Sequence, residues 1–329
     1  MNDFSYVKGF NYQPSYAYNS YEAWRFFDAD VFDREIGLGK KYFPEMNTLR
    51  IWLSYDAFRY EEDRQAENFE TALGICEKYD CKAIVCLFNC WHDATMDNGG
   101  IYHPQMIPGS IWCSNENMFD SYIEKMVKTH KDDKRILIWD ICNEPYSYGD
   151  NKVYSDFMEP YETAWLKKIF DMCKSAGVTQ PCGISSFELG TYEERMERHE
   201  RFADFTDIFL IHPYYYNSDM DVIGPNALSP EGFDKLLEEY NELSKKYNKP
   251  VLTTETCWGS RDSSIRAEIV KQTVCAHKRA NIGFIAHALH WSFVADLHDE
   301  GEAPVGYPGN LAFITRDDKI REGHEVFSC

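Results

Sequence analysis

Two glutamates each stand directly behind an apolar run that is typical of a buried strand. Glu144 follows the run ILIWDIC at residues 136–142 together with Asn143, and Pro145 then ends the strand. Glu255 follows the run VLTT, 111 residues further along the chain. Such a carboxyl pair can break a glycosidic bond, because one protonates the leaving oxygen while the other, ionised, attacks the anomeric carbon. Two carboxyls held close also push their pKa values apart, so one can stay protonated near neutral pH.

The strands that carry these glutamates belong to a chain-long alternation of short apolar runs and longer helical patterns. Strands are expected at residues 7–11, 48–53, 83–89, 136–142, 182–186, 208–212, 250–254 and 286–291. Helices are expected at residues 20–42, 66–79, 116–130, 154–176, 193–205, 230–247 and 264–281. Runs such as AIVCLF are continuously apolar, as in strands that are covered on both faces of a parallel sheet. The sequence therefore predicts an α/β fold, a single (β/α)8 barrel with elongated βα loops, as one domain over residues 1–329.

The barrel is favoured over a doubly wound open sheet. No Gly-x-Gly-x-x-Gly motif follows the first strand, where that fold usually has one. In a closed barrel, strands four and seven face each other across the mouth, and catalytic residues lie at the carboxyl ends of the strands. We therefore expect the carboxyl groups of Glu144 and Glu255 to lie about 5 Å apart, the separation found in retaining glycosidases.

Charge and composition restrict the partners and the compartment. With 34 Lys and Arg against 54 Asp and Glu, the net charge is −20, which opposes binding to nucleic acid and to anionic membranes. No run of about 18 apolar residues is present, so no membrane-spanning helix is expected. The start MNDFSYVKGFNY has no signal-peptide pattern, and the 11 cysteines are an odd number. We expect a cytoplasmic protein with reduced thiols, the alternative being a zinc site at Cys76, Cys81, Cys86 and Cys90.

The motif Asn143-Glu144-Pro145, with Glu255 at the end of strand seven, resembles the clan A retaining glycoside hydrolases, most closely the cellulase- and mannanase-like family 5. Residues 9–11 supply the strand-one Gly-x-Asn pattern of the same family, and the resemblance covers nearly the whole expected barrel. It implies that Glu144 is the catalytic acid and base, that Glu255 is the nucleophile, and that Asn143 binds the sugar 2-OH.

Polar residues on two other strands fit the family pattern around the nucleophile. Arg50 in TLRIWL matches a strand-two arginine that orients the nucleophile, and a buried guanidinium there needs a carboxylate partner such as Glu255. His212-Pro213-Tyr214 matches a His-x-Tyr motif after strand six, whose tyrosine hydroxyl contacts the nucleophile. Because Arg50 and Tyr214 beside the carboxylates replace the need for a cation, we expect no metal and no cofactor.

Three ring-bearing residues complete the expected substrate-binding set. His92 matches a family histidine at the end of strand three, and Trp291 matches a strand-eight tryptophan that forms a platform under the −1 sugar. Trp258, just beyond strand seven, is expected to line the site. His287 and His290 are open between a role in the site and a role in the core.

The substrate is expected to be an oligosaccharide, since sugars stack their apolar faces on aromatic rings. Further candidates for such stacking are Trp91, Trp112, Tyr55, Tyr102 and Tyr146. The stretch 91–114 is longer than a simple βα connection requires, so we expect a binding role for it, and a pocket closed by it would favour exo action. We expect β-mannosyl or β-glucosyl linkages in short chains, because of the expected cytoplasmic location.

Two other classes of function remain open on the sequence. A metal-dependent barrel isomerase or hydrolase would use Glu144, His212, Glu255 and Asp296 as ligands. A non-catalytic sugar-binding barrel would bind oligosaccharides without turnover. The second is disfavoured because a pure binder has no reason to keep two mutually repelling carboxylates.

Overall fold

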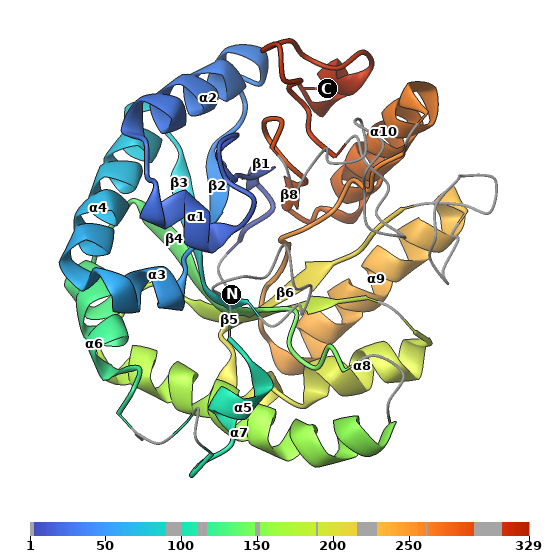
Figure 1. Ribbon diagram of the computed structural model, residues 1–329. Coiled ribbons are helices and arrows are strands. Elements are labelled where there is room, and N and C mark those ends of the chain that lie inside the picture. The colour runs from blue at the N-terminus through green and yellow to red at the C-terminus, as the bar shows by residue number, and fades with distance from the viewer. Residues whose placement is uncertain are drawn as a thin grey trace.

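Eight parallel strands close into a barrel in which each strand pairs with its neighbours in chain order (Figure 1). The computed structural model describes residues 3–89, 101–110, 113, 117–148, 152–188, 190–215, 229–260, 262–292 and 311–328. The strands are β1 (Lys8–Asn11), β2 (Thr48–Trp52), β3 (Lys82–Asn89), β4 (Ile136–Asn143), β5 (Cys182–Phe187), β6 (Ile208–His212), β7 (Val251–Thr253) and β8 (Phe284–Ala286). The predicted (β/α)8 barrel is confirmed.

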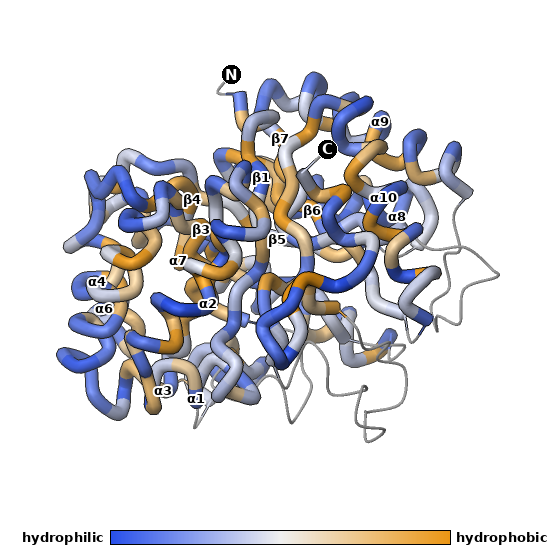
Figure 2. The backbone as a smooth tube through the Cα atoms, turned by 90° about the horizontal axis from the view of Figure 1, so that it is seen from above, coloured by the Kyte–Doolittle hydropathy of each residue, from blue (hydrophilic) through white to orange (hydrophobic). Residues whose placement is uncertain are grey.

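Helices surround the barrel, with apolar residues turned inward and hydrophilic residues outward (Figure 2). They are α1 (Ser20–Arg25), α2 (Ala29–Tyr42), α3 (Tyr55–Tyr60), α4 (Glu62–Lys78), α5 (His103–Met106), α6 (Asp120–Tyr122), α7 (Lys152–Ser175), α8 (Tyr192–Glu200), α9 (Pro230–Tyr247) and α10 (Ser263–Ala280). Local chemistry sets their ends: Ser229 accepts from the N–H of Gly232 at the start of α9, and Asn248 ends that helix in the left-handed conformation.

The predicted strand at residues 286–291 is misplaced, since β8 covers Phe284–Ala286. Beyond β8 the backbone pairs elsewhere: the N–H of Leu289 donates to Asn11, and the N–H of Trp291 donates to Ile314. The apolar pattern of this stretch thus reflects burial against the C-terminal segment 311–314. The helix expected at residues 116–130 is helical over residues 120–130, where α6 continues into a π-helical turn (Ile123–Val127) and a 3₁₀ turn (Lys128–His130).

A close approach between the first two strands explains the glycine of the Gly-x-Asn pattern. A Cβ atom on Gly9 would lie 1.8 Å from the carbonyl oxygen of Thr48 on β2. Only glycine fits at this place, and its presence lets β1 pair closely with β2. Asn11 at the end of β1 is thereby brought beside Arg50, with which it is in register.

The described part of the chain contains no helix that is both long and apolar enough to cross a bilayer. Cys76, Cys81 and Cys86 are buried free thiols. Two groups of described side chains could hold a metal ion, and neither includes a cysteine. Cys90 of the alternative zinc site lies outside the described residues.

Candidate active site

Glu144 and Glu255 meet at the carboxyl ends of β4 and β7. A carboxylate oxygen of each, together with a ring nitrogen of His212, lie within 4.8 Å of one another. Nδ1 of His212 is 2.7 Å from Oε1 of Glu144 and 3.6 Å from Oε2 of Glu255. Burial alone would lower the pKa of His212, but the carboxylates of Glu255 and Glu144 raise it. The imidazole therefore stands between the two carboxyl groups.

Glu144 occupies a strained backbone position. Its φ angle is +47°, in the left-handed region that non-glycine residues rarely adopt. The strand ends at Asn143, and the N–H of Glu144 still donates to the carbonyl of Ser185 on β5 (3.0 Å). This hydrogen bond holds the strained residue in place, so the side chain leaves the strand in a fixed direction.

Arg50 on β2 joins Glu255 to the barrel interior. Its guanidinium is completely buried and donates to Oε1 of Glu255 (2.7 Å) and, through two nitrogens, to Oδ2 of Asp140 (3.0 and 2.7 Å). It also donates to Asn11, Asn143 and Ser185. Burial alone would lower the pKa of Arg50, but Asp140 and Glu255 raise it, so the guanidinium stays charged. The predicted contact with Glu255 is present.

Replacing Arg50 is expected to cost stability as well as activity. In Arg50→Gln, the carboxylates of Asp140 and Glu255 would lose their cation in a buried place, which costs about 3–5 kcal/mol. Urea unfolding of the variant measures this loss. The control is Arg279→Gln, because Arg279 pairs with Asp234 on the surface, where an ion pair contributes at most about 1 kcal/mol. Equal losses in the two variants would contradict the prediction.

The second oxygen of Glu255 has its own partners. The hydroxyl of Tyr214 lies 2.6 Å from Oε2, and Nε2 of His287 lies 3.3 Å from the same oxygen. Burial alone would raise the pKa of Glu255, but His212, His287 and Arg50 hold it well below its usual range. Glu255 is therefore an ionised carboxylate at neutral pH.

Asn143 is oriented by its two neighbours. Its Oδ1 accepts from Arg50 (2.8 Å) and its Nδ2 donates to Oδ1 of Asn89 at the end of β3 (2.9 Å). Because Arg50 can only donate, it fixes which end of the amide faces it. The amide of Asn143 is thus held between Arg50 on β2 and Asn89 on β3.

The aromatic residues expected in the site are divided between site and core. Trp258 is half-buried and its ring meets that of Tyr214 edge-on at 4.7 Å. Trp291 is buried, and the guanidinium of Arg316 lies 4.6 Å from the centre of its ring. His92, Trp91, Trp112 and Asp296 lie outside the described residues.

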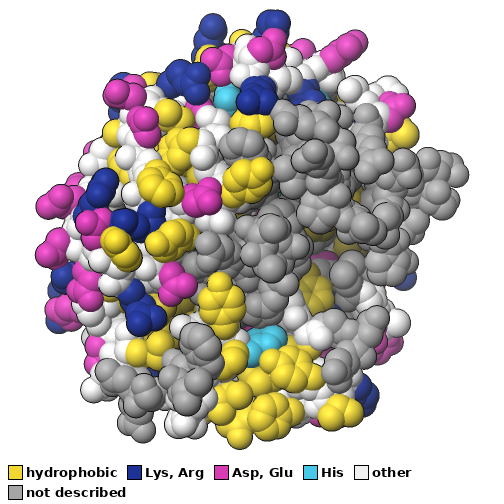
Figure 3. All heavy atoms as spheres, viewed as in Figure 1, with side chains coloured by type: hydrophobic (Ala, Val, Ile, Leu, Met, Phe, Trp, Pro, Cys, Tyr) yellow, Lys and Arg dark blue, Asp and Glu magenta, His cyan; other side chains and the backbone are white. Residues whose placement is uncertain are grey.

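Of the other stacking candidates, Tyr55 and Tyr146 are buried in the packing. Tyr55 lies among Phe88, Phe119 and Tyr122, and Tyr146 bonds through its hydroxyl to Thr163. These two are therefore structural. Tyr102, which directly precedes α5, is 40% exposed, and Figure 3 shows hydrophobic side chains gathered on the face that holds α5 and α7. The exposed apolar residues in the N-terminal half of α7 are Val153, Tyr154 and Phe157.

Sequence reasoning missed Asp140 and left His287 open. Asp140 is completely buried inside the barrel and binds both Arg50 and Ser185. The signal for it was present, because a lone carboxylate in the apolar run ILIWDI requires a buried cation. His287 follows β8 and contacts both Tyr214 and Glu255, a contact that the misplaced eighth strand concealed.

Two groups of described residues have the spacing of metal ligands. In the first, Glu144, His212 and Glu255, both oxygens of Glu255 already accept from Arg50 and Tyr214. The positive charge of the Arg50 guanidinium is already next to this group, and it would repel a metal ion bound there.

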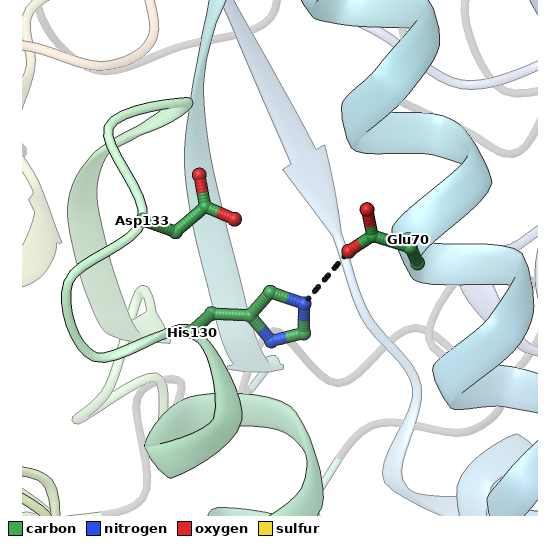
Figure 4. A group of neighbouring side chains, drawn as sticks. All are labelled: Glu70, His130 and Asp133. Atoms are coloured by element: carbon green, nitrogen blue, oxygen red, sulfur yellow. Dashed lines mark hydrogen bonds and ion pairs between the residues drawn. The ribbon is translucent and has the colours of Figure 1, made fainter.

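The second group is Glu70, His130 and Asp133, in which His130 points at Glu70 (Figure 4). Arg135 neutralises both of its carboxylates, donating to Glu70 (2.8 and 2.9 Å) and to Asp133. Asp133 precedes β4, so this network lies at the opposite end of that strand from Glu144. It ties α4 to the start of β4.

The comparisons with known proteins concern the family and the fold. A family model described as cellulase (glycosyl hydrolase family 5) matches residues 43–292. No curated protein sequence matches the chain. Among solved structures, the chain is similar to a glutamate-to-alanine variant of GH5_18 from Streptomyces cattleya in complex with Manβ1-4GlcNAc, with a TM-score of 0.74, 13% identity, and coverage of 98% of this chain and 79% of that one.

Two further solved structures share the fold. The exo-β-1,4-mannosidase from Opitutaceae bacterium strain TAV5 has a TM-score of 0.68 and 15% identity, covering 100% of this chain and 60% of that one. The endo-β-1,4-mannanase from Thermotoga petrophila has a TM-score of 0.58 and 15% identity, covering 98% of this chain and 75% of that one.

Proposed function

Since the chain belongs to the cellulase family, glycosyl hydrolase family 5, and is a hydrolase of O-glycosyl bonds, we propose that it cleaves β-linked mannosyl or glucosyl oligosaccharides with retention of configuration. The observation that carries the proposal is the approach of Glu144 and Glu255 to within 4.8 Å. Retaining enzymes hold their two carboxyls about 5–5.5 Å apart, whereas inverting enzymes need about 6.5–9.5 Å to seat a water. The close approach of one oxygen of Glu144 to one of Glu255 supports the shorter, retaining separation.

In the first step, Glu255 attacks the anomeric carbon and Glu144 gives its proton to the leaving oxygen. The C1–O bond breaks as the C1–O(Glu255) bond forms, which leaves a glycosyl ester on Glu255 and an ionised Glu144. The contacts support this division of roles, because Glu255 is the carboxylate whose charge is fixed by Arg50. The side chain of Glu144 is the more exposed of the two, at 13% against 5%.

In the second step, Glu144 works as a base. It takes a proton from water while the water oxygen attacks the anomeric carbon, and Glu255 leaves as a carboxylate. Nδ1 of His212 lies close to both carboxyl groups, so the imidazole can stabilise negative charge on either of them as the charge changes between the two steps. In this proposal Asn143 binds the 2-OH of the sugar, and Trp291 and Trp258 line the sugar site. His92, which lies outside the described residues, is proposed as a further substrate-binding residue.

Two of the similar solved structures support a mannosyl substrate, and one of them supports exo action. One neighbour holds the disaccharide Manβ1-4GlcNAc and another is an exo-β-1,4-mannosidase. We further propose a cytoplasmic location, which a short oligosaccharide substrate fits.

The test is to follow hydrolysis of p-nitrophenyl β-mannoside, p-nitrophenyl β-glucoside and Manβ1-4GlcNAc by proton NMR. We expect the β-anomer of the sugar to appear first and to mutarotate later. Initial appearance of the α-anomer would contradict retention, and binding without any product would favour a non-catalytic barrel. Activity that survives EDTA is expected, whereas loss restored by Mn²⁺ or Zn²⁺ would favour the metal-dependent alternative.

A further inference from the structure

His287, which directly follows β8, lies against Tyr214, the tyrosine that contacts the proposed nucleophile Glu255. Nε2 of His287 lies 2.8 Å from the hydroxyl of Tyr214 and 3.3 Å from Oε2 of Glu255. The two rings of His287 and Tyr214 are nearly parallel, at 10°. The backbone N–H of His287 donates to the carbonyl of Thr256 (2.9 Å), which fastens the end of β8 to the residue after Glu255. His287 is thus fixed through both its backbone and its side chain.

Counting protons among these three groups defines the direction of each hydrogen bond. The hydroxyl of Tyr214 has one proton, and Oε2 of Glu255, 2.6 Å away, belongs to an ionised carboxylate that only accepts. If Tyr214 donated to His287 instead, two oxygens would face each other at 2.6 Å with no proton between them. The arrangement that satisfies all three groups has a proton on Nε2 of His287, which donates to Tyr214, while Tyr214 donates to Glu255.

From this geometry we propose that His287 is a positioning residue, whose Nε2–H holds the Tyr214 hydroxyl in the orientation that donates to Glu255. The inference rests on the proposed role of Glu255 as nucleophile. Arg50 binds Oε1 of the same carboxylate, so both oxygens have a fixed donor. The benefit falls mainly in the second step, because Glu255 regains its charge as it leaves and meets a donor that needs no reorientation.

Two substitutions separate the donor from the bulk of the ring. H287L fills a similar space without an N–H, whereas H287Q can place an amide N–H near the position of Nε2. With an aryl β-glycoside whose activated leaving group makes the second step limiting, we expect H287L to lower kcat about 10- to 100-fold, the effect of losing a hydrogen bond that supports a charge. KM should fall together with kcat, because the glycosyl ester accumulates. H287Q should restore most of kcat.

The pH profile and a double-mutant cycle exclude a merely structural role. His287 helps to hold the pKa of Glu255 low, so H287L should move the acid limb of kcat/KM to higher pH, with Arg50 and His212 still limiting the shift. Y214F removes the hydroxyl that His287 orients, so adding H287L to Y214F should change kcat little. Independent losses would instead multiply.

The result that overturns the inference is a full additional loss from H287L in the Y214F background, or an acid limb that does not move. Thermal melting of each variant shows whether it folds. If H287L does not fold, H287Q decides, because it keeps a donor. A kcat of H287Q as low as that of Y214F would contradict the role of the N–H. If Glu255→Ala retains full activity, the proposed function fails first. If Glu255→Ala is inactive and the two losses multiply, only the role of His287 fails.

Discussion

Glu255→Ala is expected to abolish turnover of an aryl β-glycoside, and added azide is expected to restore it with an α-glycosyl azide as the product. The variant lacks the carboxylate that attacks the anomeric carbon in the proposed mechanism, so the rate should fall by about 10⁴-fold or more. Azide is small and anionic, and the cavity left by the side chain keeps Arg50 and His212, which stand on either side of the lost carboxylate. An anion in that cavity attacks from the α face, as Glu255 does in the proposed mechanism.

The control for this prediction is Glu70→Gln. Glu70 also pairs with an arginine, Arg135, but lies beside the start of β4 rather than at the mouth of the barrel. It should keep the parent kcat and KM. Rates are measured by release of the phenol, and the azide product is identified by NMR. A β-glycosyl azide from Glu255→Ala, or a rate within about a hundredfold of the parent, would refute the assignment of Glu255 as nucleophile.

The barrel could be predicted from the sequence because its strands are buried on both faces. The run at residues 208–212 matches β6 residue for residue, since a continuously apolar segment has few ways to satisfy its backbone other than as a central parallel strand. Once eight strands are counted, topology alone brings Glu144, Arg50 and Glu255 to one end of the barrel. This part of the site therefore follows from the order of the strands.

The end of the barrel could not be predicted in the same way. Residues 287–291 contain two histidines beside Ala288, Leu289 and Trp291, and this stretch pairs with residues 311–314, a contact that no local pattern encodes. The strand predicted at residues 286–291 includes His287, whereas β8 ends at Ala286. The prediction therefore did not indicate that His287 contacts Tyr214. The aromatic residues of the site could not be identified for a related reason. Nothing in the sequence distinguishes Tyr55, whose ring lies in the core, from Trp258, whose ring contacts that of Tyr214.

The difference between the two glutamates is likewise a property of the fold. From the sequence, each is a carboxylate behind an apolar run. In the structure, Glu255 receives donors on both oxygens from Arg50 and Tyr214, whereas Glu144 meets His212. A low pKa for Glu255 follows from those donors. The two glutamates therefore differ because of their partners. These partners come from β2, from β6 and from the residues just after β6, all of which lie far from either glutamate in the chain.

Glu144→Ala is expected to show a loss that depends on the leaving group. With an unactivated alkyl or oligosaccharide aglycone, the departing oxygen needs a proton, and the rate should fall about 10²- to 10⁴-fold. A dinitrophenyl aglycone leaves without that proton, so Glu255 can still form the glycosyl ester, which then accumulates because no base activates water. Azide needs no base, so it should speed turnover and give a β-glycosyl azide.

The configuration of the azide product distinguishes the roles of the two carboxyl groups, because it shows which face of the sugar azide attacks. In Glu144→Ala the α face is occupied by the ester to Glu255, so azide reaches the anomeric carbon from the β side, where the aglycone was. Pre-steady-state release of dinitrophenol should show a burst of about one equivalent per enzyme, as expected for an accumulating covalent intermediate. Equal losses for both leaving groups would remove Glu144 from the role of acid. An α-azide product would exchange the roles of the two glutamates.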